Sequence, residues 1–239
     1  MNDFKWDEDK EYISLSCGLY FSVSPLLNED HSIHKIYRIL QGIHSTPYQK
    51  NMHIMQLQTA GMNDQQILGV AKDLHEMCRN FGIVFLIDDR LDLVQPSSAD
   101  GIYISKREES SDTDYIARCR SQLGTRAIIG VNCGNSQEEA IAANDQKIVD
   151  FVVFESFFTP PHYLASKAKL EMLAWWSTYT DIPSAAKGYI TADNMELLVK
   201  EGVDFLCCDS FIWKHPKPEI AVVEVMNKIA NALEGKSVH

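Results

Sequence analysis

Hydrophobic and polar positions follow two alternating patterns along this chain, from about residue 18 to residue 233. Short apolar runs predict buried strands at residues 18–23, 53–57, 83–87, 101–104, 127–131, 151–154, 182–186 and 203–207. Apolar residues spaced by three and four predict helices between them, at residues 31–43, 64–81, 114–123, 136–145, 164–179 and 218–233. Two shorter segments complete the series, a helix or turn at 91–94 and a helix from Thr191 or Asp193 to Lys200.

Eight strand–helix units predict an α/β protein with a single closed (β/α)8 TIM barrel, in which right-handed helical crossovers connect parallel strands. An open doubly wound sheet is the alternative. It usually carries a Gly-rich phosphate loop after its first strand, and the residues from Ser22 to Pro25 offer none. No linker or shift in composition divides the sequence. We therefore expect one barrel domain over residues 16–235, preceded by a flexible segment at residues 1–15.

The composition narrows the class of partner. A net charge of −11 argues against a nucleic acid or an anionic membrane as the main partner, because either would favour a basic face. A small phosphorylated ligand needs only a local pocket. No apolar run reaches the length of a membrane span, and the acidic N-terminal segment is unlike a signal peptide, so we expect a soluble cytoplasmic protein. The six cysteines lack metal-ligand spacing and are expected to be buried thiols. A homo-oligomer is left open.

Candidate functional residues follow the predicted strands, because the carboxyl ends of the strands meet on one face of a barrel. Each one, taken alone, is equally consistent with a helix cap or a hydrated surface group. The set is Ser24, Gln56, Gln58, Asp88, Asp89, Lys106, Glu108, Asn132, Glu155, Lys187, Gly188 and Ser210. The segment at 157–163, with its two prolines, lies on the same face as either an active-site lid or a passive loop.

The adjacent carboxylates Asp88 and Asp89 are the sharpest local signal. We expect one side chain to point into the barrel mouth and the other to cap a turn or bind Arg90. Together with Glu108 after the next strand, Asp89 is a candidate ligand for Mg²⁺, which takes one or two protein carboxylates plus phosphate oxygens. The alternative is a structural pairing of Asp88 and Asp89 with Arg90 or Arg107.

The loops after the seventh and eighth strands are the candidate phosphate site. Barrels often bind phosphate there through backbone N–H groups. Gly188 allows a close backbone approach, Lys187 supplies a countercharge, and Thr191 and Ser210 complete the group. Lys187 is alternatively a solvated lysine, and Asp209 beside the site disfavours an anion.

Several stretches, in order, resemble the thiamine phosphate synthase/TenI family of barrels over residues 18–213. They are Leu19-Tyr20, Met55-Gln56-Leu57, Cys78 to Ile83, Ile87 to Leu93, Ala99 to Ile104, Ile129 to Asn132, Gly188 to Asn194 and Glu201 to Asp204. The resemblance implies a TIM barrel that joins hydroxymethylpyrimidine diphosphate to thiazole phosphate with Mg²⁺ and releases pyrophosphate. If the chain is catalytic, we expect Asp89 and Glu108 to hold Mg²⁺, Lys106 and Lys187 to neutralise phosphate, and Gln56 and Asn132 to orient the pyrimidine or the diphosphate. The other expected substrate contacts are Gln58, Asp88, Gly188, Thr191 and Ser210.

The sequence departs from the family pattern at several strand exits. After strand two, the family's Gln-Leu-Arg-x-Lys is replaced by Gln56-Leu57-Gln58-Thr59-Ala60, and after strand three its Asn-Asp is replaced by Asp88-Asp89. After strand four, Gln-x-Asp is replaced by Lys106-Arg107-Glu108, and after strand seven Gly-Gly is replaced by Gly188-Tyr189. After strand five, Asn132 stands where the family has a serine. After strand six, the family's Pro-Thr-x-Thr-Lys loop is replaced by Thr159-Pro160-Pro161-His162-Tyr163. Charged contacts to a leaving diphosphate are each worth a few kcal/mol. Their loss, only partly offset by Lys106, Arg107 and Lys187, predicts weak or absent synthase activity.

Three functional hypotheses follow. The first is a thiamine phosphate synthase-like protein of thiamine biosynthesis with impaired coupling chemistry. The second is a non-catalytic barrel that binds a small phosphorylated ligand. The third is a different, isomerase-type enzyme on the same scaffold; a TenI-type tautomerase is disfavoured because Asn132-Cys133-Gly134 lacks the histidine that such enzymes use.

Overall fold

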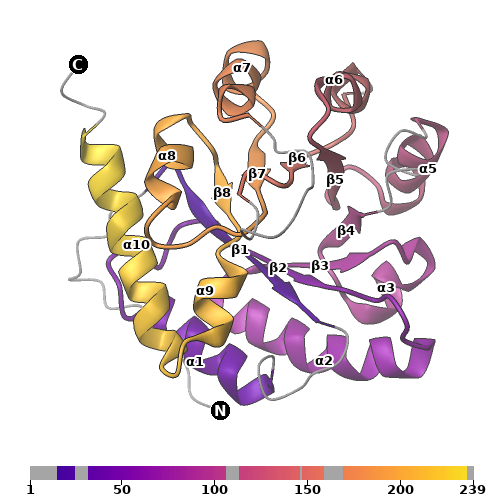
Figure 1. Cartoon of the computed structure of the whole chain (residues 1–239). Helices are drawn as coiled ribbons and strands as arrows, with labels where there is room; N and C mark the ends of the chain where they lie inside the picture. The colour runs from indigo at the N-terminus through magenta and orange to yellow at the C-terminus, as the bar shows by residue number, and fades with distance from the viewer. Residues whose placement is uncertain (1–14, 25–31, 106–112, 146, 159–168, 236–239) are drawn as a thin grey trace.

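Parallel hydrogen bonding joins each strand to the next in chain order and the last strand to the first, so the sheet closes on itself (Figure 1). The computed structural model describes residues 15–24, 32–105, 113–145, 147–158 and 169–235. The strands are β1 (Gly18–Val23), β2 (Ile54–Leu57), β3 (Val84–Asp88), β4 (Gly101–Ile104), β5 (Ile128–Gly134), β6 (Phe151–Phe154), β7 (Ser184–Ala186) and β8 (Phe205–Leu206). The predicted TIM barrel is confirmed. The expected flexible segment at 1–15 lies almost wholly outside the described residues.

Helices surround the strands on the outside of the barrel (Figure 1). They are α1 (Ile33–His44), α2 (Asp64–Phe81), α3 (Val94–Ser97), α5 (Thr113–Leu123), α6 (Gln137–Asp145), α7 (Glu171–Tyr179), α8 (Met195–Lys200), α9 (Asp209–Lys214) and α10 (Pro218–Glu234), with a 3-10 turn at Leu91–Leu93. Most predicted boundaries agree within three residues. The helix α9 was not predicted, and the first part of the helix expected at 164–179 lies outside the described residues.

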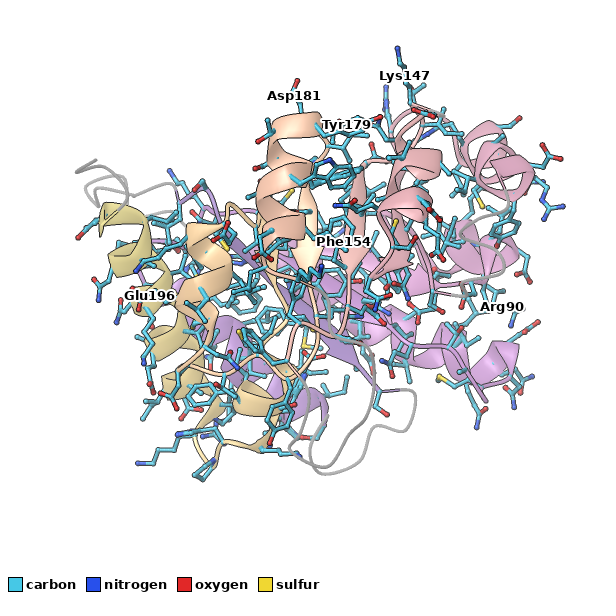
Figure 2. All side chains as sticks on the ribbon, turned by 45° about the horizontal axis from the view of Figure 1, so that its top comes forward. Arg90, Lys147, Phe154, Tyr179, Asp181 and Glu196 are labelled. Carbon is cyan, nitrogen blue, oxygen red and sulfur yellow. The ribbon has the colours of Figure 1, made fainter. Side chains whose placement is uncertain are left out.

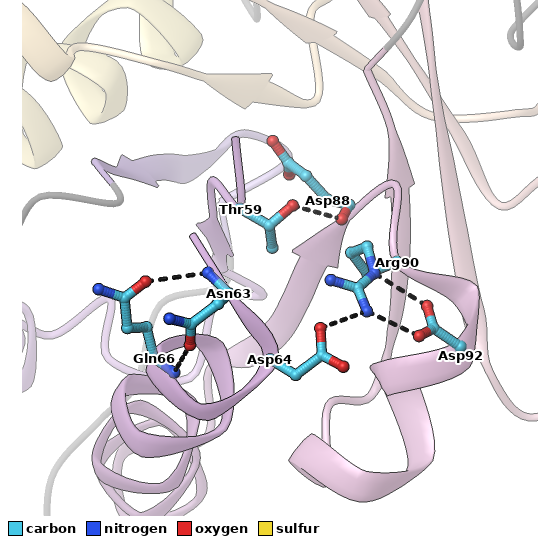
Figure 3. Close-up of polar contacts among 7 residues, drawn as sticks. All are labelled: Thr59, Asn63, Asp64, Gln66, Asp88, Arg90 and Asp92. Atoms are coloured by element: carbon cyan, nitrogen blue, oxygen red, sulfur yellow. Dashed lines mark hydrogen bonds and ion pairs between the residues drawn. The ribbon is translucent and has the colours of Figure 1, made fainter. Parts of the chain in front are cut away.

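Local sequence signals explain why α2 begins and ends where it does. The Asn63 side chain accepts a hydrogen bond from the backbone of Gln66, whose side chain accepts one from the backbone of Asn63 (Figure 3). This reciprocal capping box satisfies two of the N–H groups that a helix start leaves without partners. Gly82 ends the helix in the left-handed conformation that glycine adopts without steric cost. Among the described helices, none is long and apolar enough to cross a membrane.

A separate apolar cluster fills the inside of the barrel beneath its mouth. Tyr20, Tyr103, Phe151 and Phe205 supply most of its volume, with edge-to-face ring contacts that link Tyr20 to both Tyr103 and Phe151. Gly130 makes room for it, since a Cβ atom there would lie 2.1 Å from the Phe151 ring. The barrel is therefore a packed core with no central channel, and ligands must bind above it.

A fourfold repeat closes the opposite, amino-terminal end of the barrel. The residue immediately before each even-numbered strand accepts a hydrogen bond from a backbone N–H of the preceding odd-numbered strand. Asp100 accepts from Phe85, Asp150 from Ile129 and Asp204 from Ser184. His53 takes the equivalent place before β2, where its Nδ1 accepts from Leu19 over 3.0 Å. Polar groups at this end of the barrel therefore hold neighbouring strands together, which is a stabilising role.

All six cysteines are buried free thiols, as the sequence predicted. Burial raises the pKa of the Cys78, Cys133 and Cys208 thiols well above the ordinary value. The thiols therefore stay protonated and act as small apolar side chains.

Candidate functional site

Polar side chains replace apolar ones where the strands reach the carboxyl face. Because alternate residues of a strand face the barrel interior, Gln56 and Asp88 point inward one level above the aromatic cluster. Gln56 lies at the centre of a buried hydrogen-bond network. Its Oε1 accepts from the Tyr20 hydroxyl over 2.5 Å and from Nζ of Lys187 over 3.0 Å, while its Nε2 donates to Asp88 Oδ1 over 2.7 Å. Residues from β1, β2, β3 and the end of β7 thus meet on the barrel axis.

Lys187 directs its ammonium group down into this network. Nζ lies 4.9 Å from the ring centroid of Tyr20 and 4.9 Å from that of Tyr103, and both rings are fully buried. A cation over the faces of two aromatic rings is stabilised by their quadrupoles, more so away from water. The geometry therefore fixes this side chain, in contrast to the alternative of a solvated lysine.

Asp88 is a buried carboxyl group with an unusually high proton affinity. Burial raises its pKa to about 8, despite the opposing effects of Lys187 and of the hydrogen bond from Gln56. Its backbone carbonyl accepts a hydrogen bond from the Thr59 hydroxyl over 2.9 Å, which fixes the loop after β2 against the end of β3 (Figure 3). At neutral pH Asp88 is largely protonated, so it adds little negative charge to the mouth.

Asp89 points elsewhere, as expected for one member of the pair. Its backbone is left-handed, with φ of 52°, and its carboxylate accepts hydrogen bonds from the backbone N–H of Ser105, over 2.8 Å, and from the Ser105 hydroxyl. Arg90 bonds neither carboxylate; it bridges Asp64 at the start of α2 and Asp92 in the next turn (Figure 3). The expectation that one member of the pair points into the mouth is met by Asp88; Asp89 does not cap a turn or bind Arg90 but joins the end of β3 to the residue after β4.

Of the two predicted magnesium ligands, Asp89 lies within the described residues. Each of its carboxylate oxygens accepts a hydrogen bond from Ser105, and the described ranges hold no group of three His, Cys, Asp or Glu side chains placed to bind a metal ion. The second predicted ligand, Glu108, and the predicted catalytic Lys106 lie outside those ranges. Magnesium binding therefore stays a prediction.

Two adjoining cavities open above the network, with volumes of about 270 and 230 Å³. Both are lined by Ser22, Gln58, Asp209 and Ser210. The larger cavity is completed by Glu155, Ser156, Lys187, Gly188, Tyr189 and Cys207, and the smaller by Ser24, Trp213 and Lys214. The walls come from the ends of β1, β2, β6, β7 and β8, and together the cavities are large enough for a small heterocycle with a polar substituent.

Asp209 forms one wall of both cavities. It accepts hydrogen bonds from the backbone N–H of Ser22, over 3.2 Å, and from the indole N–H of Trp213, over 3.0 Å. Burial raises the pKa of Asp209 above its ordinary value, although Lys187 and these two hydrogen bonds each lower it in part. Asp209 thereby joins α9 to β1 and places a carboxyl group beside Ser210, where the sequence predicts phosphate.

The structure brings together eight of the predicted site residues, and two others make local hydrogen bonds. The mouth or its buried network is lined by Ser24, Gln56, Gln58, Asp88, Glu155, Lys187, Gly188 and Ser210. Asn132 instead donates to the Ser105 carbonyl over 3.2 Å and accepts from the Gly134 N–H over 2.9 Å. Thr191 is also engaged locally, because its N–H donates to the Asn194 side chain.

Sequence reasoning missed several residues that shape the mouth. Ser22, Tyr20 and Tyr103 were absent from the predicted site, although strand alternation places all three on the inward face. Tyr189 lines the larger cavity from a position where the family pattern has a second glycine. That departure was a signal of a changed cavity.

These features define a (β/α)8 barrel with a polar pocket at the carboxyl ends of its strands. A family model described as thiamine monophosphate synthase matches residues 19–212, and the chain belongs to this family. It is 32% identical over 176 residues to a thiamine-phosphate synthase from Rhodospirillum centenum, covering 73% of this chain and 82% of the relative. It is 29% identical over 188 residues to one from Nitrosomonas eutropha, covering 78% and 82%.

A solved structure shows the same fold. Thiamine phosphate pyrophosphorylase from Pyrococcus furiosus aligns with a TM-score of 0.75 and 22% sequence identity, covering 91% of this chain and 98% of that one. At this identity the likeness bears on the fold alone. Family membership rests on the sequence matches.

Proposed function

We propose that this barrel binds a phosphorylated intermediate of thiamine synthesis at its mouth and does not couple the two family substrates at an enzymatic rate. The observation that supports this is the placement of Lys187. Of the described residues that line the larger cavity, it is the one with a positive charge, and its ammonium is held in the network of Gln56 and the two tyrosine rings. Stabilising a leaving diphosphate requires several cations aimed at the developing charge.

The charges facing the same cavity are unfavourable for a diphosphate. Glu155 and Asp209 line it, and Gln58 stands where the family pattern has arginine. At short range in a partly desolvated site, each such carboxylate opposes an anion by about as much as a lysine attracts it. A single phosphate group carries less negative charge than a diphosphate and needs fewer cations. The groups that would bind it are the Lys187 ammonium, the backbone at Gly188 and the Ser210 hydroxyl, which all line the larger cavity.

The first test compares binding with chemistry. Isothermal titration should detect micromolar binding of thiazole phosphate, while incubation with hydroxymethylpyrimidine diphosphate, thiazole phosphate and Mg²⁺ should yield no thiamine phosphate above the protein-free rate. Lys187→Met should weaken binding of thiazole phosphate about tenfold or more, by the usual 1.4 kcal/mol per tenfold. Lys147→Met is the matched control, because Lys147 lies at the periphery of the molecule, away from the mouth (Figure 2).

The catalytic alternative makes the opposite prediction. In it, Asp89 and Glu108 hold Mg²⁺, and Lys106 and Lys187 neutralise the diphosphate. Thiamine phosphate and pyrophosphate would then form together, and Asp89→Ala would abolish both. An unchanged affinity for thiazole phosphate in Lys187→Met would count against the binding proposal.

A further inference from the structure

One carboxyl oxygen of Asp209 accepts two hydrogen bonds in the wall that the two cavities share. The backbone N–H of Ser22 and the indole N–H of Trp213 both donate to Oδ1, over 3.2 and 3.0 Å, and neither donates to Oδ2. All three residues line the smaller cavity, and Ser22 and Asp209 line the larger one as well. The carboxyl group is therefore fixed in a wall against which a ligand would lie.

The two donors belong to well-packed parts of the chain. Ser22 is the fifth residue of β1, and its hydroxyl accepts a hydrogen bond from the Gln58 side chain over 2.8 Å. Trp213 is buried, and its ring packs edge-to-face against that of Phe21, with the centroids 6.4 Å apart. If Asp209 turned away, both N–H groups would lose their acceptor, which is unfavourable. The carboxyl group thus stays in place when a ligand arrives.

The groups around Asp209 affect its proton affinity in both directions. Burial raises its pKa, whereas the Lys187 ammonium, the Cys207 thiol and the two N–H donors lower it in part. The other titratable groups nearby are Tyr20 and Cys208, with Glu155 in the wall of the larger cavity and Lys214 in that of the smaller. Burial raises the pKa of Tyr20, Cys207 and Cys208, so these three stay neutral. A phosphate beside Asp209 would add negative charge and raise its pKa further.

We propose that Asp209 takes up a proton from solvent when a phosphorylated ligand binds, and that the protonated carboxyl then donates a hydrogen bond to the phosphate. Oδ1 keeps its two N–H donors, and the proton goes to Oδ2. A charge that repels the ligand becomes a neutral donor that holds it. The inference rests on the proposed function and adds a regulation of that site, because the affinity then depends on pH.

Asp209→Asn imitates the protonated state. The amide oxygen accepts from Ser22 and Trp213, and the amide nitrogen supplies the donor. Dissociation constants for thiazole phosphate are measured by calorimetry for both proteins from pH 5 to pH 8.5, and the ligand's own titration cancels in their ratio. We expect the variant to bind about tenfold more tightly at pH 8.5, with the difference shrinking as pH falls, because wild-type Asp209 is then already protonated.

Proton uptake is a second readout, which a purely structural role would not change. Titration at pH 7.5 in buffers of different ionisation enthalpy gives the number of protons bound with each ligand. The wild type should take up more protons than Asp209→Asn, by up to about one per ligand. Asp181→Asn is the matched control, since Asp181 is exposed and lies beyond the end of α7, away from the mouth (Figure 2). It should match the wild type in both readouts.

Trp213→Phe tests the positioning of the carboxyl group. The change removes one N–H donor that stabilises the charged form, so the pKa of Asp209 should rise. The gain in affinity from Asp209→Asn, measured in the Trp213→Phe background, should therefore begin at a higher pH than in the wild-type background. An onset at the same pH would show that the indole N–H does not control this carboxyl group.

The outcomes distinguish this inference from the proposed function. Equal affinity and equal proton uptake in the wild type and Asp209→Asn overturn the inference and leave the binding of phosphorylated ligands standing. Weaker binding by Asp209→Asn, or an affinity ratio that does not change with pH, overturns it in the same way. If neither protein binds thiazole phosphate at any pH, the proposed function is contradicted and the inference falls with it.

Discussion

The ammonium group of Lys187 donates a hydrogen bond to Oε1 of Gln56 over 3.0 Å, although 131 positions separate the two residues in the chain. The bond crosses the barrel from β7 to β2, strands that are not neighbours in the sheet. It also fixes the orientation of the Gln56 amide, so that Nε2 faces Asp88. This arrangement makes the mouth a preformed structure whose charges are already partly satisfied before a ligand arrives.

Asp88→Asn should alter how stability depends on pH. The pKa of Asp88 is about 8 in the folded chain and 3.8 ordinarily, so folding retains its proton. The stability that depends on this proton is fully present below pH 4 and is lost as pH rises toward 8, by up to ~1.4 kcal/mol per pH unit. Asparagine keeps the acceptor for Gln56 and does not titrate. In urea unfolding from pH 5 to 9, the free energy of unfolding of the variant should therefore rise relative to that of the wild type as pH increases.

The same series has a clear contrary outcome. If the free energies of unfolding of wild type and Asp88→Asn run parallel from pH 5 to 9, Asp88 is not a protonated group in the folded chain. The assignment of its role at the mouth would then be wrong.

His53→Asn should improve resistance to acid. Burial lowers the pKa of His53 from 6.5 to about 4, so the folded chain disfavours the charged ring. The stability that depends on a neutral His53 is therefore fully present above pH 6.5 and is lost as pH falls toward 4. The loss in the free energy of unfolding is about 3 kcal/mol in all, at ~1.36 kcal/mol per pKa unit. Asparagine still offers an oxygen to the Leu19 N–H. Thermal melts should show that the melting temperature falls less from pH 7 to pH 4.5 in the variant than in the wild type. An equal fall would show that His53 is not the cause of the acid sensitivity.

Gly130→Ala should strain the core inside the barrel. The new methyl group would lie 2.1 Å from the Phe151 ring, which neighbouring rings hold in place. Overpacking of this kind costs about 1–3 kcal/mol. Phe151→Leu in the same chain should recover part of the loss, a coupling that a double-mutant cycle measures in urea unfolding. Strictly additive effects would show that the two sites do not interact.

Asp150→Ala should lower stability without changing ligand affinity. Asp150 accepts a hydrogen bond from the Ile129 N–H over 2.7 Å and pairs with Arg120, both at the end of the barrel opposite the mouth. Losing the acceptor for a backbone N–H costs about 1–3 kcal/mol. Asp150→Asn keeps that acceptor and should cost less. A change in the affinity for thiazole phosphate would contradict the separation between a stabilising end and a binding end.

The fold was predictable because each segment carries its own signal. The apolar runs, the capping residues of α2 and the glycine that ends it fix the elements locally, and eight alternations favour a closed barrel. The inward positions of Gln56, Asp88 and Lys187 follow from strand alternation. The contacts among them do not, because they depend on which side chains meet across the barrel axis.

Other parts of the site carry no local signal. The bond between Asp89 and Ser105 and the anchoring of Asp209 by Trp213 depend on the backbone path of loops. The short helix α9 begins at Asp209 without a side-chain cap, and β8 has only two residues, so neither boundary is marked by a sequence pattern. Tyr189 stands out only against the family pattern.

The most direct test of the account is a single-turnover experiment. Protein in excess is mixed with labelled hydroxymethylpyrimidine diphosphate, saturating thiazole phosphate and Mg²⁺, then quenched over time, so that even slow product release cannot mask chemistry. We predict labelled thiamine phosphate no faster than in the protein-free mixture, alongside measurable binding of thiazole phosphate. Stoichiometric product that disappears in Asp89→Ala would show an active synthase and contradict the account.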